Sequence, residues 1–105
     1  MADTEAKLWL DIKPDLRGWW QRLETTTPNG LPDCIGLYAG HAQFLELKIG
    51  KPSINALRAS QHNFFIECQR HDVEAWVLFR HRGVLKWFRG PTIGDPCVPP
   101  PFYRP

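Results

Sequence analysis

Residues 43–49 have the sequence QFLELKI, and they constrain the architecture more tightly than any other part of the chain. The stretch is apolar on both faces except at Glu46 and Lys48. A strand that is covered on both sides belongs in the middle of an α/β sheet. Two charged side chains on such a strand cost free energy unless they are paired or bound to something. The stretch therefore predicts a central strand and indicates that Glu46 and Lys48 are functional residues.

A second apolar strand, residues 34–39, precedes this one, and a turn at Gly40-His41 joins the two. Glycine at the first position of a two-residue turn favours type II′. That turn places residues whose numbers sum to about 81 opposite each other, so Asp33 is expected to face Lys48 on one side of the sheet. Glu46 is then the diagonal neighbour of Asp33, roughly 7–8 Å away and within reach of a shared metal. A shift of one residue would send Asp33 to the opposite face.

The rest of the chain alternates between helical and strand patterns. Pro14 is expected to end a short first helix, and a second helix carries an apolar stripe. The expected elements are a helix at 4–12, strands at 19–25, 34–39 and 43–49, a helix at 58–71, and strands at 74–80 and 84–89. This order predicts an α/β fold with a central mixed sheet flanked by helices.

Length and composition indicate one compact domain. The chain has 105 residues, and we expect the domain to span residues 1–90. Five prolines lie between Pro96 and Pro105, so residues 91–105 are predicted to form a proline-rich arm. The arm is expected either to lie across a partner subunit or to fold back on its own domain.

The cysteines and the hydropathy pattern bear on the cellular setting. There are three cysteines and no C-x-x-C pair, which argues against a disulfide framework and a zinc knuckle. Cys34 and Cys68 lie among apolar residues and are predicted to be buried thiols. The sequence has neither a signal peptide pattern nor an apolar run long enough to span a membrane. These features predict an intracellular, cytoplasmic protein that does not use a membrane.

A family resemblance is carried by three groups of residues. Gly30-Leu31-Pro32-Asp33, followed after twelve residues by Glu46-Leu47-Lys48, resembles the PD-(D/E)XK nuclease signature. Lys51 and Gln61 add to it, and the likeness runs from about Glu5 to Phe79. The pattern is most similar to the VRR-NUC branch, the virus-type replication-repair nucleases, and especially to its short stand-alone phage members. The resemblance implies a restriction-endonuclease-like core and hydrolysis of DNA phosphodiester bonds.

The same resemblance implies roles for individual residues. The side chains of Asp33 and Glu46, with the backbone carbonyl of Leu47, would hold Mg²⁺ or Mn²⁺, which are hard ions that take oxygen ligands. Lys48 would orient the attacking water or stabilise the pentavalent transition state. Gln61 would reach the same water or the phosphate, although it could also simply cap its helix.

Two features of the resemblance leave alternatives open. The acid that the family places on its first helix falls on Glu5 or on Glu24. At His71-Asp72 the chain departs from relatives, which often leave this helix on glycine, so the geometry of that turn is open.

Basic residues are unevenly distributed along the chain. The net charge is +2, but residues 58–105 contain seven basic and four acidic residues, so a polyanion would prefer this half. Lys51, Arg58, Arg80, Arg82 and Lys86 are predicted to contact DNA. The alternative for the residues of the second hairpin is a solvated surface.

These observations predict a structure-selective, metal-dependent endonuclease that acts on Holliday junctions, flaps or other branched DNA. The alternative is a non-catalytic DNA-binding or assembly module that retains the nuclease fold. A homodimer is expected, because one small domain offers a small footprint on DNA and a two-fold dimer presents two sites to two strands. Five tryptophans and the aromatic residues of the arm supply apolar material for an interface.

Overall fold

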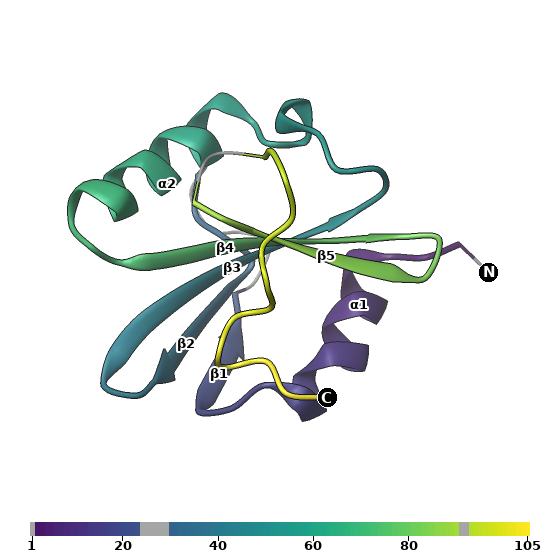
Figure 1. Ribbon diagram of the computed structural model, residues 1–105, viewed down its shortest axis with the longest axis horizontal. Coiled ribbons are helices and arrows are strands. Elements are labelled where there is room, and N and C mark those ends of the chain that lie inside the picture. The colour runs from purple at the N-terminus through teal and green to yellow at the C-terminus, as the bar shows by residue number, and fades with distance from the viewer. Residues whose placement is uncertain (1, 24–29, 91–92) are drawn as a thin grey trace.

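The computed structural model describes residues 2–23, 30–90 and 93–105. Its helices and strands follow the predicted order of one helix, three strands, one helix and two strands (Figure 1). They are α1 (Glu5–Ile12), β1 (Trp19–Arg22), β2 (Cys34–Tyr38), β3 (His41–Ile49), α2 (Ala59–Arg70), β4 (Glu74–His81) and β5 (Val84–Arg89), with short 3₁₀ turns at Lys13–Asp15 and Ile54–Ala56. The first strand was expected to run to Thr25, and Glu24 and Thr25 lie outside the described residues.

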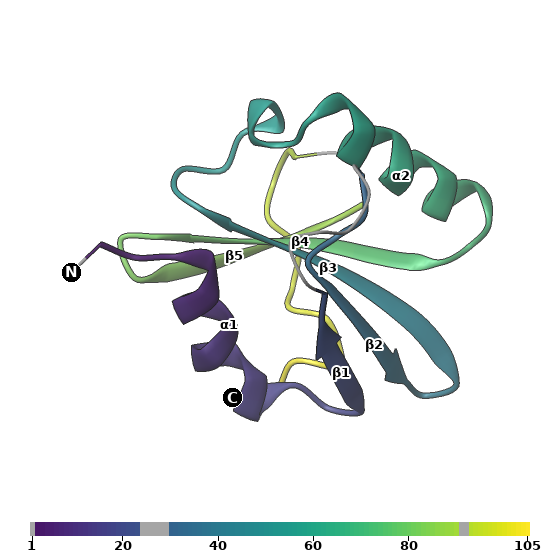
Figure 2. The ribbon, with the colours of Figure 1, turned by 180° about the vertical axis from the view of Figure 1, so that it is seen from behind.

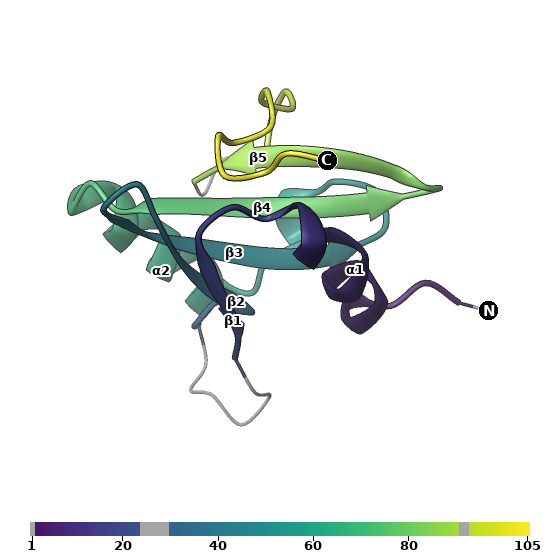
Figure 3. The same cartoon turned by 90° about the horizontal axis from the view of Figure 1, so that it is seen from below.

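The five strands form one mixed sheet in the order β1-β2-β3-β4-β5. β3 lies in the middle, antiparallel to β2 and parallel to β4, while the β1–β2 and β4–β5 pairs are antiparallel. Figure 3 shows β3 and β4 running side by side along the centre of the sheet. Leu45 and Leu47 of β3 are fully buried, as a central strand requires. The prediction of a central α/β strand at residues 43–49 is confirmed.

The two helices cover opposite faces of the sheet (Figures 1 and 2). α1 packs on the face that carries Leu45, Leu47 and Leu78, while α2 packs on the face that carries Val77 and Phe79. Successive side chains of a strand point to opposite faces, so β3 and β4 contribute to both cores. Glu46 and Lys48 therefore point to the α2 face of the sheet.

The hairpin between β2 and β3 differs from the predicted one. Tyr38 pairs with His41, so the turn is Ala39-Gly40 rather than Gly40-His41. Ala39 and Gly40 have φ of 52° and 82°, and positive φ at both positions is typical of type I′ rather than type II′. The prediction failed because it assumed that glycine must stand first in the turn, whereas in a type I′ turn the alanine accepts the left-handed conformation.

The corrected register changes the residue opposite Asp33. In this antiparallel register, the position next to the Cys34–Leu45 pair places Asp33 opposite Glu46, not opposite Lys48. The error amounts to two positions in the pairing, so it preserves the face on which each side chain lies. For that reason, the corrected register still places Asp33 and Glu46 on one face, as predicted.

The C-terminal arm folds back on its own domain. Ile93 packs against the core on the α2 face, Cys97 bridges to Trp87 on β5, and Phe102 lies on the α1 face, where it is 1% exposed. The arm thus crosses the outer edge of β5 from one face of the sheet to the other (Figure 1). Phe102 of the arm is therefore not available to bridge two subunits.

Two further expectations concern cysteines and membranes. Cys34 and Cys68 are buried, as predicted, and Cys97 is exposed. Across the described ranges, neither helix is long and apolar enough to cross a membrane.

Candidate active site

The candidate site forms beside the first residue of β2, where β3 continues past the β2–β3 pairing. The last paired residues are Cys34 and Leu45, so the edge of β3 beyond Leu45 is not covered by β2. Asp33 lies at this opening. Its backbone N–H donates to Oε1 of Glu46 at 3.1 Å, and its Oδ2 accepts from the backbone N–H of Leu47 at 2.9 Å. The N–H and C=O of one strand residue point to the same side of the strand, so the Leu47 carbonyl lies on the side of Asp33.

A glycine allows the loop that leads to Asp33 to pack against α2. Gly30 has a φ of 95°, and a Cβ at this position would lie 2.8 Å from the carbonyl oxygen of Ser60 in the first turn of α2. The chain can pass so close to the helix only without a side chain. Gly30 therefore brings the loop that carries Asp33 up to the N-terminal end of α2.

Three carboxylates meet at the opening. One carboxylate oxygen each from Glu5, Asp33 and Glu46 lie within 4.8 Å of one another. Glu5 stands in the first turn of α1, whose N-cap Thr4 accepts a hydrogen bond from the backbone N–H of Lys7 at 3.0 Å. The structure thus brings the first-helix candidate Glu5 to the other two acids. The second candidate, Glu24, lies outside the described residues.

Lys48 and Gln61 complete the site from the α2 side. The Nζ of Lys48 lies 3.1 Å from Oε2 of Glu46 and 3.4 Å from Oε1 of Gln61. The Nε2 of Gln61 donates to the same Glu46 oxygen at 2.9 Å. Oε1 of Gln61 also accepts from the backbone N–H of Arg58 at 3.0 Å. Gln61, which is 4% exposed, therefore both caps the start of α2 and holds the catalytic candidates.

The electrostatics of the cluster are unfavourable in the absence of a cation. Burial, together with the negative charge of Asp33, raises the pKa of Glu46 to about 7, although Lys48 acts in the opposite direction. Burial and Asp33 also raise the pKa of Glu5. Carboxylates held close together repel each other, and each disfavours ionisation of the next.

The donor set fits a hard divalent cation. Oxygen atoms within 4.8 Å of one another can share an ion at the 2.0–2.6 Å distances typical of Mg²⁺ and Ca²⁺. The donors are carboxylates, with the Leu47 carbonyl on the same side, which suits Mg²⁺ or Mn²⁺ better than a softer metal. A bound cation would also offset the repulsion that raises the pKa of Glu46.

The predicted DNA-contacting residues separate into three groups. Lys51, Arg82 and Lys86 line one hollow. Arg58 is exposed at the N-cap of α2, next to Gln61. Arg80 differs, because its side chain is only 12% exposed and its guanidinium pairs with two carboxylates of the N-terminal region.

Arg80 is held by Asp3 at 2.5 Å and by Asp11 at 2.8 Å. These contacts raise the pKa of Arg80 above its ordinary range, with the hydrogen bond to Asp3 as the largest cause. Arg80 is therefore not part of the proposed DNA-contacting set. The sequence contained no signal for this pairing, because Arg80 lies 77 residues from Asp3 and 69 residues from Asp11 along the chain.

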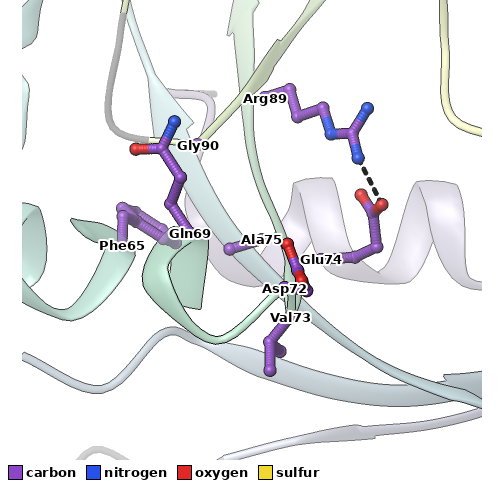
Figure 4. Close-up of a pocket in the computed structure, with 8 residues that line it drawn as sticks. All are labelled: Phe65, Gln69, Asp72, Val73, Glu74, Ala75, Arg89 and Gly90. Carbon is purple, nitrogen blue, oxygen red and sulfur yellow. Dashed lines mark hydrogen bonds and ion pairs between the residues drawn. The ribbon is translucent and has the colours of Figure 1, made fainter. Parts of the chain in front are cut away.

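A second hollow lies at the other end of the sheet. It measures about 320 Å³ and lies between the C-terminal half of α2 and the start of β4, with Arg89 and Glu74 paired at its edge (Figure 4). Asp72, in the turn after α2 whose geometry the sequence left open, has a φ of 55° and takes the left-handed conformation itself. None of the predicted site residues lines this hollow, so the candidate chemistry lies at the β2–β3 opening.

A solved structure resembles this protein in fold. Hjc, a Holliday junction resolvase from the archaeal hyperthermophile Archaeoglobus fulgidus, is similar at a TM-score of 0.55, with 19% sequence identity over 81% of this chain and 74% of that chain. The likeness shows that the two chains share an α/β fold, and the predicted fold class is confirmed.

A second solved structure is less similar. SSO0001 is similar at a TM-score of 0.46 and 11% identity, over 90% of this chain and 50% of that chain. No family model matches the sequence, and no curated protein matches it either. The predicted VRR-NUC branch and phage type stay predictions.

Proposed function

We propose that this protein is a metal-dependent endonuclease that cleaves DNA in a structure-selective manner. One observation carries the proposal: Glu5, Asp33 and Glu46 meet within 4.8 Å, and Lys48 contacts Glu46 at 3.1 Å. A buried Glu46 with two further carboxylates and a lysine beside it costs the fold free energy unless the charges are bound to something. Metal-dependent phosphodiester hydrolysis uses such an arrangement, because the acids hold a metal that neutralises charge on the phosphate and helps to activate a water.

The residues have distinct roles in this proposal. Asp33 and Glu46, with the Leu47 carbonyl, would hold Mg²⁺ or Mn²⁺, and Glu5 would support the ion from α1. When bound, the cation would supply activation of a water and stabilisation of the charge on the phosphate. Lys48 donates a hydrogen bond to the attacking water or to the phosphate oxygen that gains charge.

Gln61 is a positioning residue in the same proposal. It orients Glu46 and Lys48 through its amide and ties both to the start of α2. Neither side chain can then turn away from the opening without breaking a hydrogen bond.

Branched DNA is the proposed substrate class. The support is the shared fold with a Holliday junction resolvase, together with the resemblance of Asp33, Glu46 and Lys48 to the nuclease signature. A homodimer, presenting two sites to two strands, stays part of the proposal. Phe102 does not supply its interface, since it is buried in its own core. An intracellular setting is also proposed.

The proposal is tested by incubating the protein with four-way, flapped, nicked and linear DNAs of matched sequence, each with Mg²⁺ and with Mn²⁺. We expect cleavage of at least one branched substrate, none in EDTA, and slower cleavage of the linear duplex. Absence of cleavage on every substrate with both metals would overturn it.

The non-catalytic DNA-binding module is the second candidate. The described part of the chain retains every member of the acid–lysine–glutamine set, which a pure binding module would not need. Calorimetric titration with Mg²⁺ and Mn²⁺ separates the two candidates. Binding that is lost in Asp33→Asn supports the enzyme, whereas DNA binding without any metal binding supports the module.

A further inference from the structure

Three basic residues far apart in the sequence line one hollow of about 430 Å³. Lys51 comes from the loop after β3, while Arg82 and Lys86 come from the β4–β5 hairpin, which lies at the same end of the sheet as that loop (Figure 1). His81 also lines the hollow, with Phe88, Pro52, Gly94 and Pro96 as its uncharged walls. Phe88 is 1% exposed, so this wall is part of the rigid core.

The charges in this hollow are not neutralised within the described structure. Arg70, Arg80 and Arg89 each pair with a carboxylate. Across residues 2–23, 30–90 and 93–105, Lys51, Arg82 and Lys86 take part in no ion pair, and none of the described residues that line the hollow is acidic. Asp95 lies between Gly94 and Pro96 in the sequence but does not line the hollow. The hollow therefore presents three permanent positive charges.

The hollow is on the same face of the sheet as the acidic cluster. Lys48 on β3 pairs with Phe79 on β4, and Phe79 pairs with Lys86 on β5. Paired residues point to one face, so Lys48 and Lys86 lie in one row with Phe79 between them. Two strand spacings separate their Cα atoms by about 10 Å. That distance corresponds to the axial rise of about three nucleotides in one DNA strand.

The turn that presents Arg82 is a defined one. Arg82 and Gly83 have φ of 53° and 77°, which is typical of a type I′ hairpin turn between His81 and Val84. A short turn of this kind limits the freedom of the backbone, so Arg82 is presented from a fixed position. An arginine offers a planar set of donors that matches phosphate oxygens.

We propose that the hollow lined by Lys51, Arg82 and Lys86 binds a second phosphate group of the DNA, about three nucleotides or fewer from the bond that the acidic cluster cleaves. The inference rests on the proposed function in taking DNA as the ligand. The phosphate belongs either to an internal phosphodiester or to a strand end, which carries a second negative charge. Binding there fixes the register of the strand over Glu46 and Lys48.

The first experiment measures binding without cleavage. The Asp33→Asn protein is titrated with a fluorescent branched DNA at several salt concentrations. Adding Arg82→Gln and Lys86→Gln is expected to weaken binding about tenfold and to reduce the slope of log K against log salt by about one. The matched control adds Arg70→Gln and Arg104→Gln, which remove the same charge from exposed positions away from the hollow. Equal loss in both proteins would overturn the proposal, because it would indicate only a general charge effect.

The second experiment keeps this inference separate from the proposed function. Inorganic phosphate is added to the wild-type protein, and backbone amide shifts are followed by NMR. We expect saturable shifts at His81, Arg82, Gly83 and Lys51, which the Arg82→Gln/Lys86→Gln protein loses. Neither result depends on cleavage, so an inactive protein that shows them would overturn the nuclease and leave the phosphate site. Unshifted amides together with unchanged DNA affinity would overturn the phosphate site and leave the nuclease.

The source of the phosphate is resolved with modified DNA. A 5′-phosphate that tightens binding over a 5′-hydroxyl, only in the protein with an intact hollow, identifies a strand end. Loss of affinity when one internal phosphate is replaced by a neutral methylphosphonate identifies a phosphodiester.

Discussion

The backbone N–H of Asp33 donates a 3.1 Å hydrogen bond to Oε1 of Glu46, so the two proposed metal ligands are joined directly across the β2–β3 opening. The Asp33 carboxylate in turn accepts from the N–H of Leu47. Each acid therefore has a structural contact as well as a charge. Variants that remove the charge alone must be separated from variants that also remove an acceptor.

Asp33→Asn is expected to leave the fold intact, because an amide oxygen can still accept from the Leu47 N–H. Asp33→Ala leaves that N–H without its partner and should cost about 1–3 kcal/mol more than the asparagine variant. Urea unfolding of both proteins in EDTA measures the difference. Equal stability of the two would contradict the role that we assign to the hydrogen bond.

Lys48→Ala is expected to lower kcat by about 100- to 1,000-fold with little change in DNA affinity, because Lys48 lies beside the proposed metal ligands rather than on an exposed surface. Single-turnover cleavage and DNA titration in Ca²⁺ measure the two quantities separately. A parallel loss of rate and affinity would instead make Lys48 a simple phosphate contact.

Gln61→Ala is expected to reduce both stability and activity. The side chain makes buried or half-buried hydrogen bonds with Arg58, Glu46 and Lys48, so its loss should cost about 1–3 kcal/mol in the free energy of unfolding. A purely structural role would leave the pH profile of cleavage unchanged. A positioning role predicts that the profile shifts, because Glu46 loses a donor; an unshifted profile with normal kcat in folded protein would refute that role.

The stability of the metal-free protein should fall as pH rises from about 4.5 to about 7. The pKa of Glu46 is raised to about 7, so the folded state binds its proton more tightly than the unfolded state does. The stabilisation is complete below the unfolded pKa and is lost as pH passes through the folded one, a change of up to about 3 kcal/mol. Thermal unfolding in EDTA across this range tests it, with Glu46→Gln as the variant whose profile should flatten. A wild-type profile that rises with pH would contradict the assignment.

Arg80→Gln is expected to destabilise the protein and to leave DNA affinity unchanged, because Arg80 ties Asp3 and Asp11 to β4. Chemical unfolding and DNA titration, each compared with Arg82→Gln, measure both effects. A stable Arg80→Gln protein with weakened DNA binding would return Arg80 to the DNA-contacting set.

The sequence predicted the fold because the pattern in residues 43–49 has few physical solutions. A strand that is buried on both sides lies in the centre of its sheet, and the order of the remaining elements follows from short-range patterns. The hairpin register was missed because Ala39 adopts a positive φ, which a rule based on glycine does not anticipate.

The long-range contacts of the site could not be predicted in the same way. The pairing of Arg80 with Asp3, and the approach of Glu5 to Asp33, depend on where α1 packs. Local patterning does not determine that position. The folding of the arm onto its own core, through Phe102, was left open for the same reason.

The most direct test of the central claim is the rate at which wild-type and Asp33→Asn proteins cleave a four-way DNA junction in Mg²⁺ or Mn²⁺, with equal folding checked by circular dichroism. Our account predicts metal-dependent cleavage by the wild type and a loss to the level of the EDTA control in Asp33→Asn. Cleavage by Asp33→Asn at the wild-type rate would contradict it, because the acidic cluster could not then be the catalytic centre.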